Sequence, residues 1–476
     1  MKRNDKMIES LDKIDNLYEV IKKADSGDLE AQYKAARYIL HELELAESDQ
    51  DIINRAIKYL RNAAMSGYYH GIAAEELGSL YYNGHHVNQD YKQAIIWYRT
   101  AAQKRQPIAY YGLGKCFYNG NGVEKDFTKA FDSFFKGDLL GYTNNRIILG
   151  DMYKKGEFVE RDDGYALKIY QSVYESEQNL FDKHGLYSDA YGIACLRLGE
   201  CYMSGIGTTI SIEKANGYFQ TAKKHSADAH WAMQPDKTDA ETARLLRLMY
   251  DAPYSEDIDY ESRQENTDVD DFFDIITKGL PEYKLVYYPD SELKELCKSN
   301  PLVTKFDDTP FMDIYNGVLE NDPRKMYEMA IICYQGDKSI SKNPALYDYA
   351  MYLFHQSLLA GCSDPLEILG LCYYHGDTVK QSYETALFLY RLSEQPMAYG
   401  EIGVYYANGH GVEKDDLMAY QYFVKCLLFD KKRAGETYKN LAIIYPHLDC
   451  FEKDQVFLDY CQEASVKYAS DQNDTF

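Results

Sequence analysis

An eight-residue pattern recurs along the chain, and this recurrence constrains the fold more than any other feature. Its form is Leu-Gly-x-x-Tyr/Phe-x-x-Gly, as in LGKCFYNG at Leu113–Gly120. Further copies begin at Leu77, Leu149, Leu198, Leu369 and Ile402, and a weaker copy occupies Met329–Gly336. The first three copies begin 36 residues apart. Such a period predicts an array of repeats rather than one compact core.

The residues that follow each octet repeat as well. In the six full copies, Val or Thr stands three residues after the final Gly, Asp or Ser six after it, and Ala ten after it. An aromatic residue stands four positions beyond each Ala. The second octet residue is Gly78, Gly114, Gly150, Gly199, Ala330, Gly370 or Gly403. The alanine is Ala94, Ala130, Ala166, Ala215, Ala350, Ala386 or Ala419. The aromatic is Tyr98, Phe134, Tyr170, Phe219, Phe354, Tyr390 or Phe423.

This pattern predicts a hairpin of two helices in each copy. The first, fourth and fifth octet residues lie on one face of a helix. The final glycine can take the left-handed conformation that ends a helix, and the later Asp or Ser can cap the next one. Because glycine in the second position weakens a helix, we expect another helix to pack closely there. The alanine and the aromatic give the second helix a small-and-large packing face.

The motif LG-x-x-Y-x-x-G-x-G-V-x-x-D-x-x-K-A-x-x-W/Y/F is nearly complete in Leu113–Phe134 and Ile402–Phe423. It resembles the Sel-one-like repeat (SLR) family, whose α-hairpins are related to tetratricopeptide repeats. The resemblance implies an all-α fold, a right-handed superhelical solenoid that binds partners and performs no chemistry. It covers seven repeats in two blocks, four in residues 77–224 and three in residues 325–430.

The family includes a cysteine-rich secreted branch, in which cysteines pair as disulfides within repeats. Here Cys116, Cys201 and Cys372 occupy one slot of the first helix, without a regular mate in the second helix. We therefore expect them to be reduced, small and buried, which places this chain outside that branch.

The remaining residues form two end segments and an insert. Residues 1–76 contain a degenerate repeat at Glu30–Gly67, and residues 431–476 contain capping helices within Ala434–Ala469. Residues 225–324 are expected to form an irregular, acidic and mostly helical insert. Atypical end repeats are typical of repeat arrays, because the termini must present a polar outer side.

Within the insert, Asp251–Asp274 carries ten acidic residues against one arginine. Three interpretations of this segment stay open: a solvated linker, a strip that docks on a basic partner, and an arm that folds back into the groove of the solenoid. Further on, Lys284–Asp290 has the pattern of a short strand and Ser291–Asn300 that of a short helix. Asn321 or Asp322 is expected to cap the helix that restarts the array.

The charge balance limits the class of partner. The chain carries a net charge of −23 with a pI near 4.9, so neither nucleic acid nor an anionic membrane would attract it. Solubility is the simplest interpretation, and a surface for a basic partner is the alternative. No window reaches the roughly 18 apolar residues of a membrane helix, and the first residues lack a secretion signal. A cytoplasmic location is expected, although export without a signal would leave no trace.

Each motif that could carry chemistry lacks residues that the chemistry requires. The Asn-Gly-Asn-Gly turn lacks the Lys-Ser/Thr of a phosphate-binding loop, and it recurs as a structural turn would. His85 and His86 are adjacent, and His225 and His230 stand five apart, but neither pair has the further ligands of a metal site. There is no CxxC and no Gly-x-Ser-x-Gly. We expect no catalytic residue, no cofactor and no metal, with an enzyme site in residues 225–321 as a minor alternative.

Helix periodicity instead predicts a surface for a partner. If the first, fourth and fifth octet residues are packed, the third, sixth and seventh face outward or into the groove. These candidates are Ser79, Tyr82, Asn83, Lys115, Tyr118, Asn119, Asp151, Lys154, Lys155, Tyr374, His375 and Asn408, with Leu371, Val404 and Ala407 in the same positions. Columns of Tyr and Asn would suit an extended peptide. The alternative for the tyrosines is packing against the next repeat.

The leading hypothesis is a non-catalytic scaffold or adaptor that binds a protein or peptide in its concave groove. A second hypothesis, from another class, is an inhibitor, immunity or effector-type protein whose acidic surface masks a basic partner. Both expect a protein partner, and neither involves nucleic acid or membrane insertion.

Overall fold

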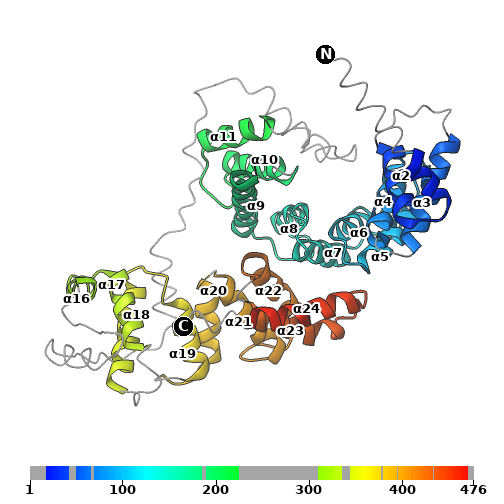
Figure 1. Cartoon of the computed structure of the whole chain (residues 1–476). Coiled ribbons are helices and arrows are strands. Elements are labelled where there is room, and N and C mark those ends of the chain that lie inside the picture. Colours follow the sequence, from blue (N-terminus) through cyan, green and yellow to red (C-terminus); the bar gives the residue numbers. More distant parts are fainter. Residues whose placement is uncertain are drawn as a thin grey trace. The chain divides into compact units, whose positions relative to one another are not determined.

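The computed structural model describes residues 18–41, 50–65, 69–184, 189–224, 309–334, 344–376, 379–393, 395–431 and 434–469. Regular structure in these ranges is helical, and they contain no strand (Figure 1). The predicted all-α solenoid is confirmed. The segments Asp251–Asp274, Lys284–Asp290 and Ser291–Asn300 of the expected insert lie outside the described residues.

Contacts divide the chain into two bodies, of which the first comprises Met1–Tyr254 and Asp449–Tyr460. Its described helices follow one another in five pairs, after a helical segment at residues 18–25. The pairs are α2 (Leu29–His41) and α3 (Gln50–Met65), α4 (His70–Asn83) and α5 (Tyr91–Ala102), α6 (Pro107–Asn119) and α7 (Phe127–Leu139), α8 (Asn144–Lys155) and α9 (Asp163–His184), and α10 (Asp189–Ser204) and α11 (Ile212–Lys224).

The second body comprises Ser255–Leu448 and Cys461–Phe476. Its described helices are α16 (Thr309–Leu319), α17 (Pro323–Tyr334), α18 (Pro344–Leu359), α19 (Leu366–His375), α20 (Tyr383–Ser393), α21 (Pro396–Asn408), α22 (Asp416–Phe429) and α23 (Gly435–Ile444), with a 3-10 turn at Tyr445–His447. The last helix, α24 (Gln455–Ala469), begins in a segment of the first body. At the restart of the array, Asp322 caps α17 by accepting from the N–H groups of Arg324 and Lys325.

The turns inside the hairpins have the predicted caps at both ends. Gly120 ends α6 in the left-handed conformation, with φ of 76°. Asp126 then caps α7, because its Oδ1 accepts a hydrogen bond from the N–H of Lys129 at 3.0 Å. The same pair of caps encloses the turns that follow α4, α8, α19 and α21. The local sequence therefore fixes where each helix of a hairpin ends and begins.

The glycine slot of the first helix and the aromatic slot of the second helix touch each other in the six full copies. A Cβ atom at Gly78 would lie 2.5 Å from Cδ1 of Tyr98, and one at Gly370 would lie 2.8 Å from Cε1 of Tyr390. The same relationship joins Gly114 and Phe134, Gly150 and Tyr170, Gly199 and Phe219, and Gly403 and Phe423. The aromatic ring of the second helix thus lies directly on the backbone of the first helix.

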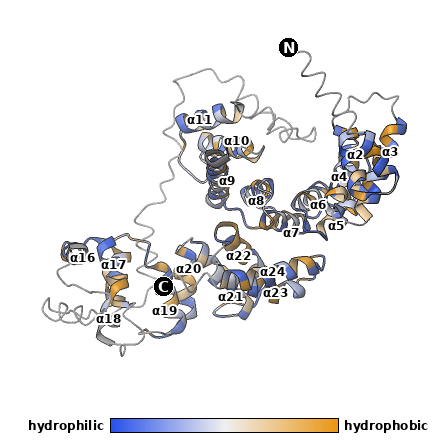
Figure 2. Cartoon of the chain, in the orientation of Figure 1, coloured by the Kyte–Doolittle hydropathy of each residue, from blue (hydrophilic) through white to orange (hydrophobic). Residues whose placement is uncertain are grey.

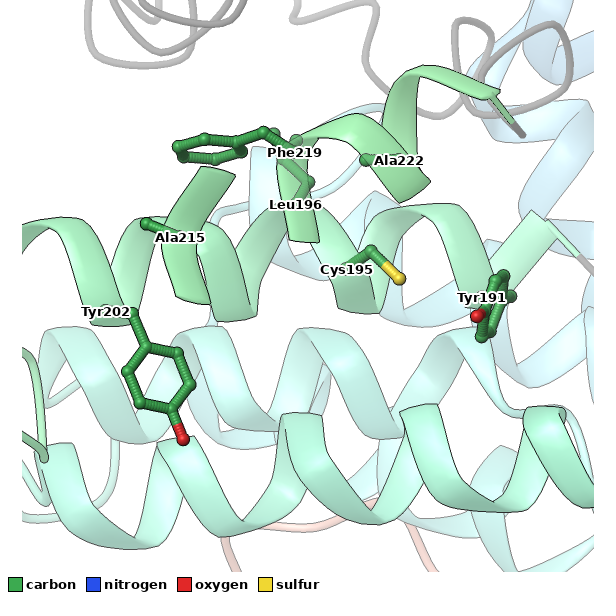
Figure 3. Close-up of a cluster of buried hydrophobic side chains, with 7 residues drawn as sticks. All are labelled: Tyr191, Cys195, Leu196, Tyr202, Ala215, Phe219 and Ala222. Atoms are coloured by element: carbon green, nitrogen blue, oxygen red, sulfur yellow. The ribbon is translucent and has the colours of Figure 1, made fainter. Parts of the chain in front are cut away.

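The hydrophobic core runs through the hairpins. Between α10 and α11, one buried cluster contains Tyr191, Cys195, Leu196, Tyr202, Ala215, Phe219 and Ala222 (Figure 3). Apolar and polar residues are mixed on the helices of both bodies (Figure 2). Among the described helices, none is long and apolar enough to cross a membrane.

First helices of successive repeats lie closer together than second helices do. In the first body α4 contacts α6 and α8 contacts α10, and in the second body α21 contacts α23. Second helices of successive repeats approach each other less. Because the inner side of a curved array is its crowded side, these three junctions favour the first helices as the lining of an inner face.

Candidate interaction surface

The seventh octet residues are the most accessible of the predicted groove positions. Asn83, Asn119, Lys155, His375 and Asn408 are all exposed. Each is the last residue of its helix, directly before the glycine that ends the helix. These side chains therefore occupy the same exposed end of the first helix in their repeats.

The sixth-position tyrosines of the first body reach the turn of the next repeat. The hydroxyl of Tyr82 accepts a hydrogen bond from Nδ2 of Asn121 at 3.1 Å. The hydroxyl of Tyr118 donates to Glu157 at 2.7 Å. Both tyrosines are half-buried. Their hydroxyls therefore connect neighbouring repeats, and part of each ring stays accessible.

Lysines of the chain stand over both of these rings. The Nζ atom of Lys115 lies 4.6 Å from the ring centroid of Tyr82 and 5.5 Å from that of Tyr111. The Nζ atom of Lys155 lies 5.7 Å from the ring centroid of Tyr118 and donates to its hydroxyl at 3.0 Å. A cation is attracted to the face of an aromatic ring. In the first body, cations of the chain itself already occupy this position.

Asp151 differs from the other candidates because it is only 6% exposed. Its carboxylate accepts hydrogen bonds from Arg197 at 2.7 and 2.8 Å and from the hydroxyl of Tyr170 at 2.7 Å. Burial raises the pKa of Asp151, but the charge of Arg197 outweighs burial and holds the pKa below its ordinary value. The structure places Asp151 inside the array, so we remove it from the candidate partner surface.

A second ion pair crosses the same junction between repeats. Lys154 lies 2.9 Å from Glu200, so Asp151 and Lys154 of one repeat face Arg197 and Glu200 of the next with opposite charges. Periodicity alone missed Arg197, which comes one residue before its octet. Opposite charges at inward positions of adjacent repeats are the sequence signal that could have identified it.

Ser79, in the third octet position of its repeat, also points toward a neighbouring helix. Its Oγ accepts a hydrogen bond from the hydroxyl of Tyr98 at 3.3 Å. The equivalent pair in a later repeat is Tyr170 with Asp151. In both repeats, the third octet residue satisfies the buried tyrosine of the second helix.

A cavity of about 600 Å³ lies in the first body, between α5, α6, α7 and a segment that carries Glu452 and Asp454. Each of the three carboxylates in its lining is paired with a cation. Arg99 lies 2.5 Å from Glu452, and Nζ of Lys136 lies 2.8 Å from Asp132 and 3.0 Å from Asp454. Burial lowers the pKa of Lys136, but the two carboxylates more than offset this effect and raise it. The two carboxylates therefore favour the charged form of Lys136.

The histidine pair in the first full repeat has no arrangement for metal binding. Nε2 of His86 lies 3.2 Å from the carbonyl oxygen of Leu40, and His85 is exposed. Across the described ranges, no group of three His, Cys, Asp or Glu residues could hold a metal ion. His225 and His230 lie outside those ranges.

The three cysteines in the shared slot are buried and in the thiol form. Cys116, Cys201 and Cys372 are each 0% exposed, and none forms a disulfide. Burial raises the pKa of the Cys116 thiol to about 12. These thiols therefore act as small apolar side chains, as the sequence predicts.

The chain matches the family model described as Sel1 repeat in eight segments. They are residues 29–68, 71–105, 107–132, 147–175, 192–225, 326–362, 368–394 and 396–425, which together exceed half of the chain. The first segment covers the hairpin of α2 and α3, which lacks the glycine-rich turn. Sel1 repeat proteins generally mediate protein–protein interactions, and the fold is generally a non-catalytic scaffold.

Two solved structures are similar to this chain. One is c5321, which displays an SLR fold and is a protective antigen present in uropathogenic Escherichia coli strains. Its sequence is 21% identical, the alignment covers 96% of each chain, and the TM-score is 0.32. The other is a Sel1 repeat protein from Oxalobacter formigenes, with 19% identity, 48% of this chain and 88% of that chain covered, and a TM-score of 0.36. The comparison with curated proteins found no match.

Proposed function

The chain belongs to the Sel1 repeat family, and we propose that it is a non-catalytic scaffold or adaptor that binds a protein or peptide along its first helices. The observation that carries this proposal is the exposure of the seventh-position residues, at the ends of α4, α6 and α8 in the first body and of α19 and α21 in the second. Side chains at the same place in successive repeats can meet an extended chain at regular intervals.

The chemistry of these residues suits contact with a peptide backbone. Asn83, Asn119 and Asn408 each offer a donor and an acceptor group, which can pair with backbone amides. The half-buried rings of Tyr82 and Tyr118 belong to the same helix ends and add contact area. The three carboxylates of the first-body cavity are each paired with Arg99 or Lys136, which favours a structural role for these groups.

The proposal can be tested with peptides selected from a displayed random library against the purified full-length chain. Asn83→Ala combined with Asn119→Ala should raise the Kd of the selected peptides on the order of tenfold. The matched control combines Lys92→Ala with Glu175→Ala, two exposed positions on the second helices α5 and α9. An equal loss in both variants, or a library that yields no binding peptide, would contradict the proposal.

The second candidate function is inhibition of a basic partner. It is supported by the net charge of −23 and by two half-buried acids of the second body, Glu367 and Glu401, for which no ion pair occurs among the described residues. The two functions differ in their effect on the partner. A partner that loses its own activity in the complex supports inhibition, and one that stays active supports the scaffold.

A further inference from the structure

Four rings from two successive repeats of the second body meet in one cluster. They belong to Tyr374 in α19, Tyr383 in α20, Tyr405 in α21 and His410 in the turn after α21 (Figure 1). The six distances between ring centroids range from 4.7 to 6.2 Å, and Tyr383 stacks on His410. Tyr405 is fully buried, whereas the other three rings are half-buried. The cluster therefore presents aromatic surface to solvent on a rigid base.

In the first body, a lysine of the chain covers the tyrosine ring at the equivalent position. There, Lys115 in the third octet position of one repeat stands over the ring of Tyr82 in the preceding repeat. The corresponding pair in the second body is Val404 and Tyr374. Within the described ranges, no lysine or arginine of the chain stands over the Tyr374 ring. At Tyr374, the second body therefore has the aromatic ring without a lysine or arginine of the described residues over it.

A carboxylate lies beside these rings. Burial raises the pKa of Glu401, and the charge of Glu367 raises it further. The described residues give Glu401 no hydrogen bond and no ion pair. Burial is the main cause of the raised pKa of Tyr390, with the charge of Glu401 next, and the same charge acts on Tyr374 and Tyr405. Glu401 is half-buried and lies one helical turn before Tyr405 in α21. A partly desolvated carboxylate without an opposite charge attracts a cation from outside more strongly than a fully exposed one does.

Two buried hydroxyls at this place lack a hydrogen bond. The Oη atoms of Tyr390 and Tyr405 have no partner among the described residues, and their side chains are 1% and 0% exposed. In the first body, the tyrosine equivalent to Tyr390 is Tyr98, which donates to Ser79. Leu371 stands in the position of that serine and cannot accept a hydrogen bond. The junction of α19 with α21 is therefore unsatisfied in both charge and hydrogen bonding.

We propose that Tyr374, Tyr383, Tyr405 and His410, together with Glu401, form a cation site for a lysine or arginine side chain of a basic segment in the partner protein. This inference rests on the proposed scaffold function and adds the chemistry of its partner. The aromatic rings attract the cation, and the half-buried Glu401 supplies the opposite charge beside them. The net charge of −23 steers a basic segment toward the protein.

The probe is a fluorescein-labelled peptide in which lysine and alanine alternate, and its binding to the full chain is measured by fluorescence anisotropy. A second peptide carries arginine in place of lysine, and two controls carry acetyl-lysine or glutamate. We expect the lysine and arginine peptides to bind. The acetyl-lysine peptide should bind at least about tenfold more weakly, because acetylation removes the charge that the rings and the carboxylate attract.

Variants of the chain locate the binding. Glu401→Gln removes the charge and keeps the shape, so it should raise the Kd of the lysine peptide about tenfold. Glu320→Gln, at an exposed carboxylate of the same body, is the matched control and should change the Kd less than about twofold. Val404→Lys introduces a lysine at the position from which Lys115 reaches Tyr82, and it should abolish binding by occupying the cation site.

The outcomes separate this inference from the scaffold proposal. If Glu401→Gln and Val404→Lys bind the lysine peptide as the wild type does, while library-selected peptides still bind, the cation site is wrong and the scaffold function stands. If no peptide of any charge binds, the scaffold proposal fails as well. Circular dichroism checks the fold of each variant. Val404 is half-exposed, so its substitution decides the question if Glu401→Gln does not fold.

Discussion

A Cβ atom at Gly150 would lie 2.6 Å from Cε1 of Tyr170, the fully buried aromatic of the following helix. The ring has little freedom to retreat, because its hydroxyl donates to Asp151 at 2.7 Å. The two helices of this hairpin therefore pack at a separation that leaves no space for a side chain at Gly150.

Gly150→Ala should lower the free energy of unfolding of the first body by about 1–3 kcal/mol. Steric overlap with Tyr170 outweighs the better helix propensity of alanine, which favours the substitution by no more than about 1 kcal/mol. Urea denaturation followed by circular dichroism measures the change. The matched control is Gly217→Ala in α11, where no atom lies within 4 Å of an added Cβ. That control should gain stability, and a gain in both variants would show that the hairpin adjusts freely.

The buried ion pair between Asp151 and Arg197 yields a second prediction. Arg197→Met leaves the Asp151 carboxylate buried without its opposite charge, so it should cost roughly 3–5 kcal/mol of unfolding free energy. The double variant Asp151→Asn with Arg197→Met removes both charges and should cost clearly less. A double-mutant cycle in urea measures the coupling between the two side chains. Additive losses would show that the pair contributes no interaction energy.

The ion pair between Asp151 and Arg197 also predicts how the stability of the fold depends on pH. Because the pKa of folded Asp151 lies below its ordinary 3.8, its ionisation stabilises the fold at pH values above that number. This contribution is lost as the pH falls through the lowered pKa. The wild type should therefore lose stability more steeply than Asp151→Asn between about pH 4 and pH 2. Urea midpoints measured across this interval test the prediction, and equal slopes would contradict it.

The architecture of one hairpin could be predicted from sequence because its determinants are local. Gly120 and Asp126 occupy caps that any helix of this length needs, and the turn between them recurs with the same spacing. The contact between Gly114 and Phe134 could also be expected, because both positions recur at every repeat.

Contacts between repeats were harder to predict, because they depend on how one hairpin stacks on the next. Asp151 occupies a position that helix periodicity turns outward, yet Arg197 from the next repeat covers it. Tyr118 illustrates the same difficulty: its ring is in the predicted position, but only stacking brings Glu157 to its hydroxyl. The pattern of one repeat contains no information about the residue of opposite charge in its neighbour.

Glu75 should give a pH dependence of the opposite sign to that of Asp151. Burial, and then the charge of Glu76, raises the pKa of Glu75 from 4.5 to about 7. A raised pKa means that the associated stability is complete below pH 4.5 and is lost as the pH rises through about 7. Glu75→Gln should therefore leave the stability at pH 4 nearly unchanged and increase it at pH 8. Glu213→Gln, at an exposed carboxylate of α11, should behave like the wild type at both pH values.

Deletion of Asp251–Asp274 distinguishes the cation site from the acidic segment as the origin of binding to basic peptides. The segment carries ten acidic residues, and an exposed acidic stretch attracts lysine peptides mainly at low salt. If Glu401 provides the specific contact, the deletion should change the Kd of the lysine peptide less than about twofold near physiological ionic strength. Glu401→Gln in the deleted chain should still raise the Kd about tenfold.

Two other results of the deletion would change the interpretation of Asp251–Asp274. Binding that weakens about tenfold would assign the docking of the basic segment to this stretch. Binding that tightens about tenfold would mean that the stretch competes with the peptide in the intact chain, as an autoinhibitory arm would. Anisotropy titrations at low and high salt separate these results from general charge effects, because long-range attraction by ten acidic residues is strong chiefly at low salt.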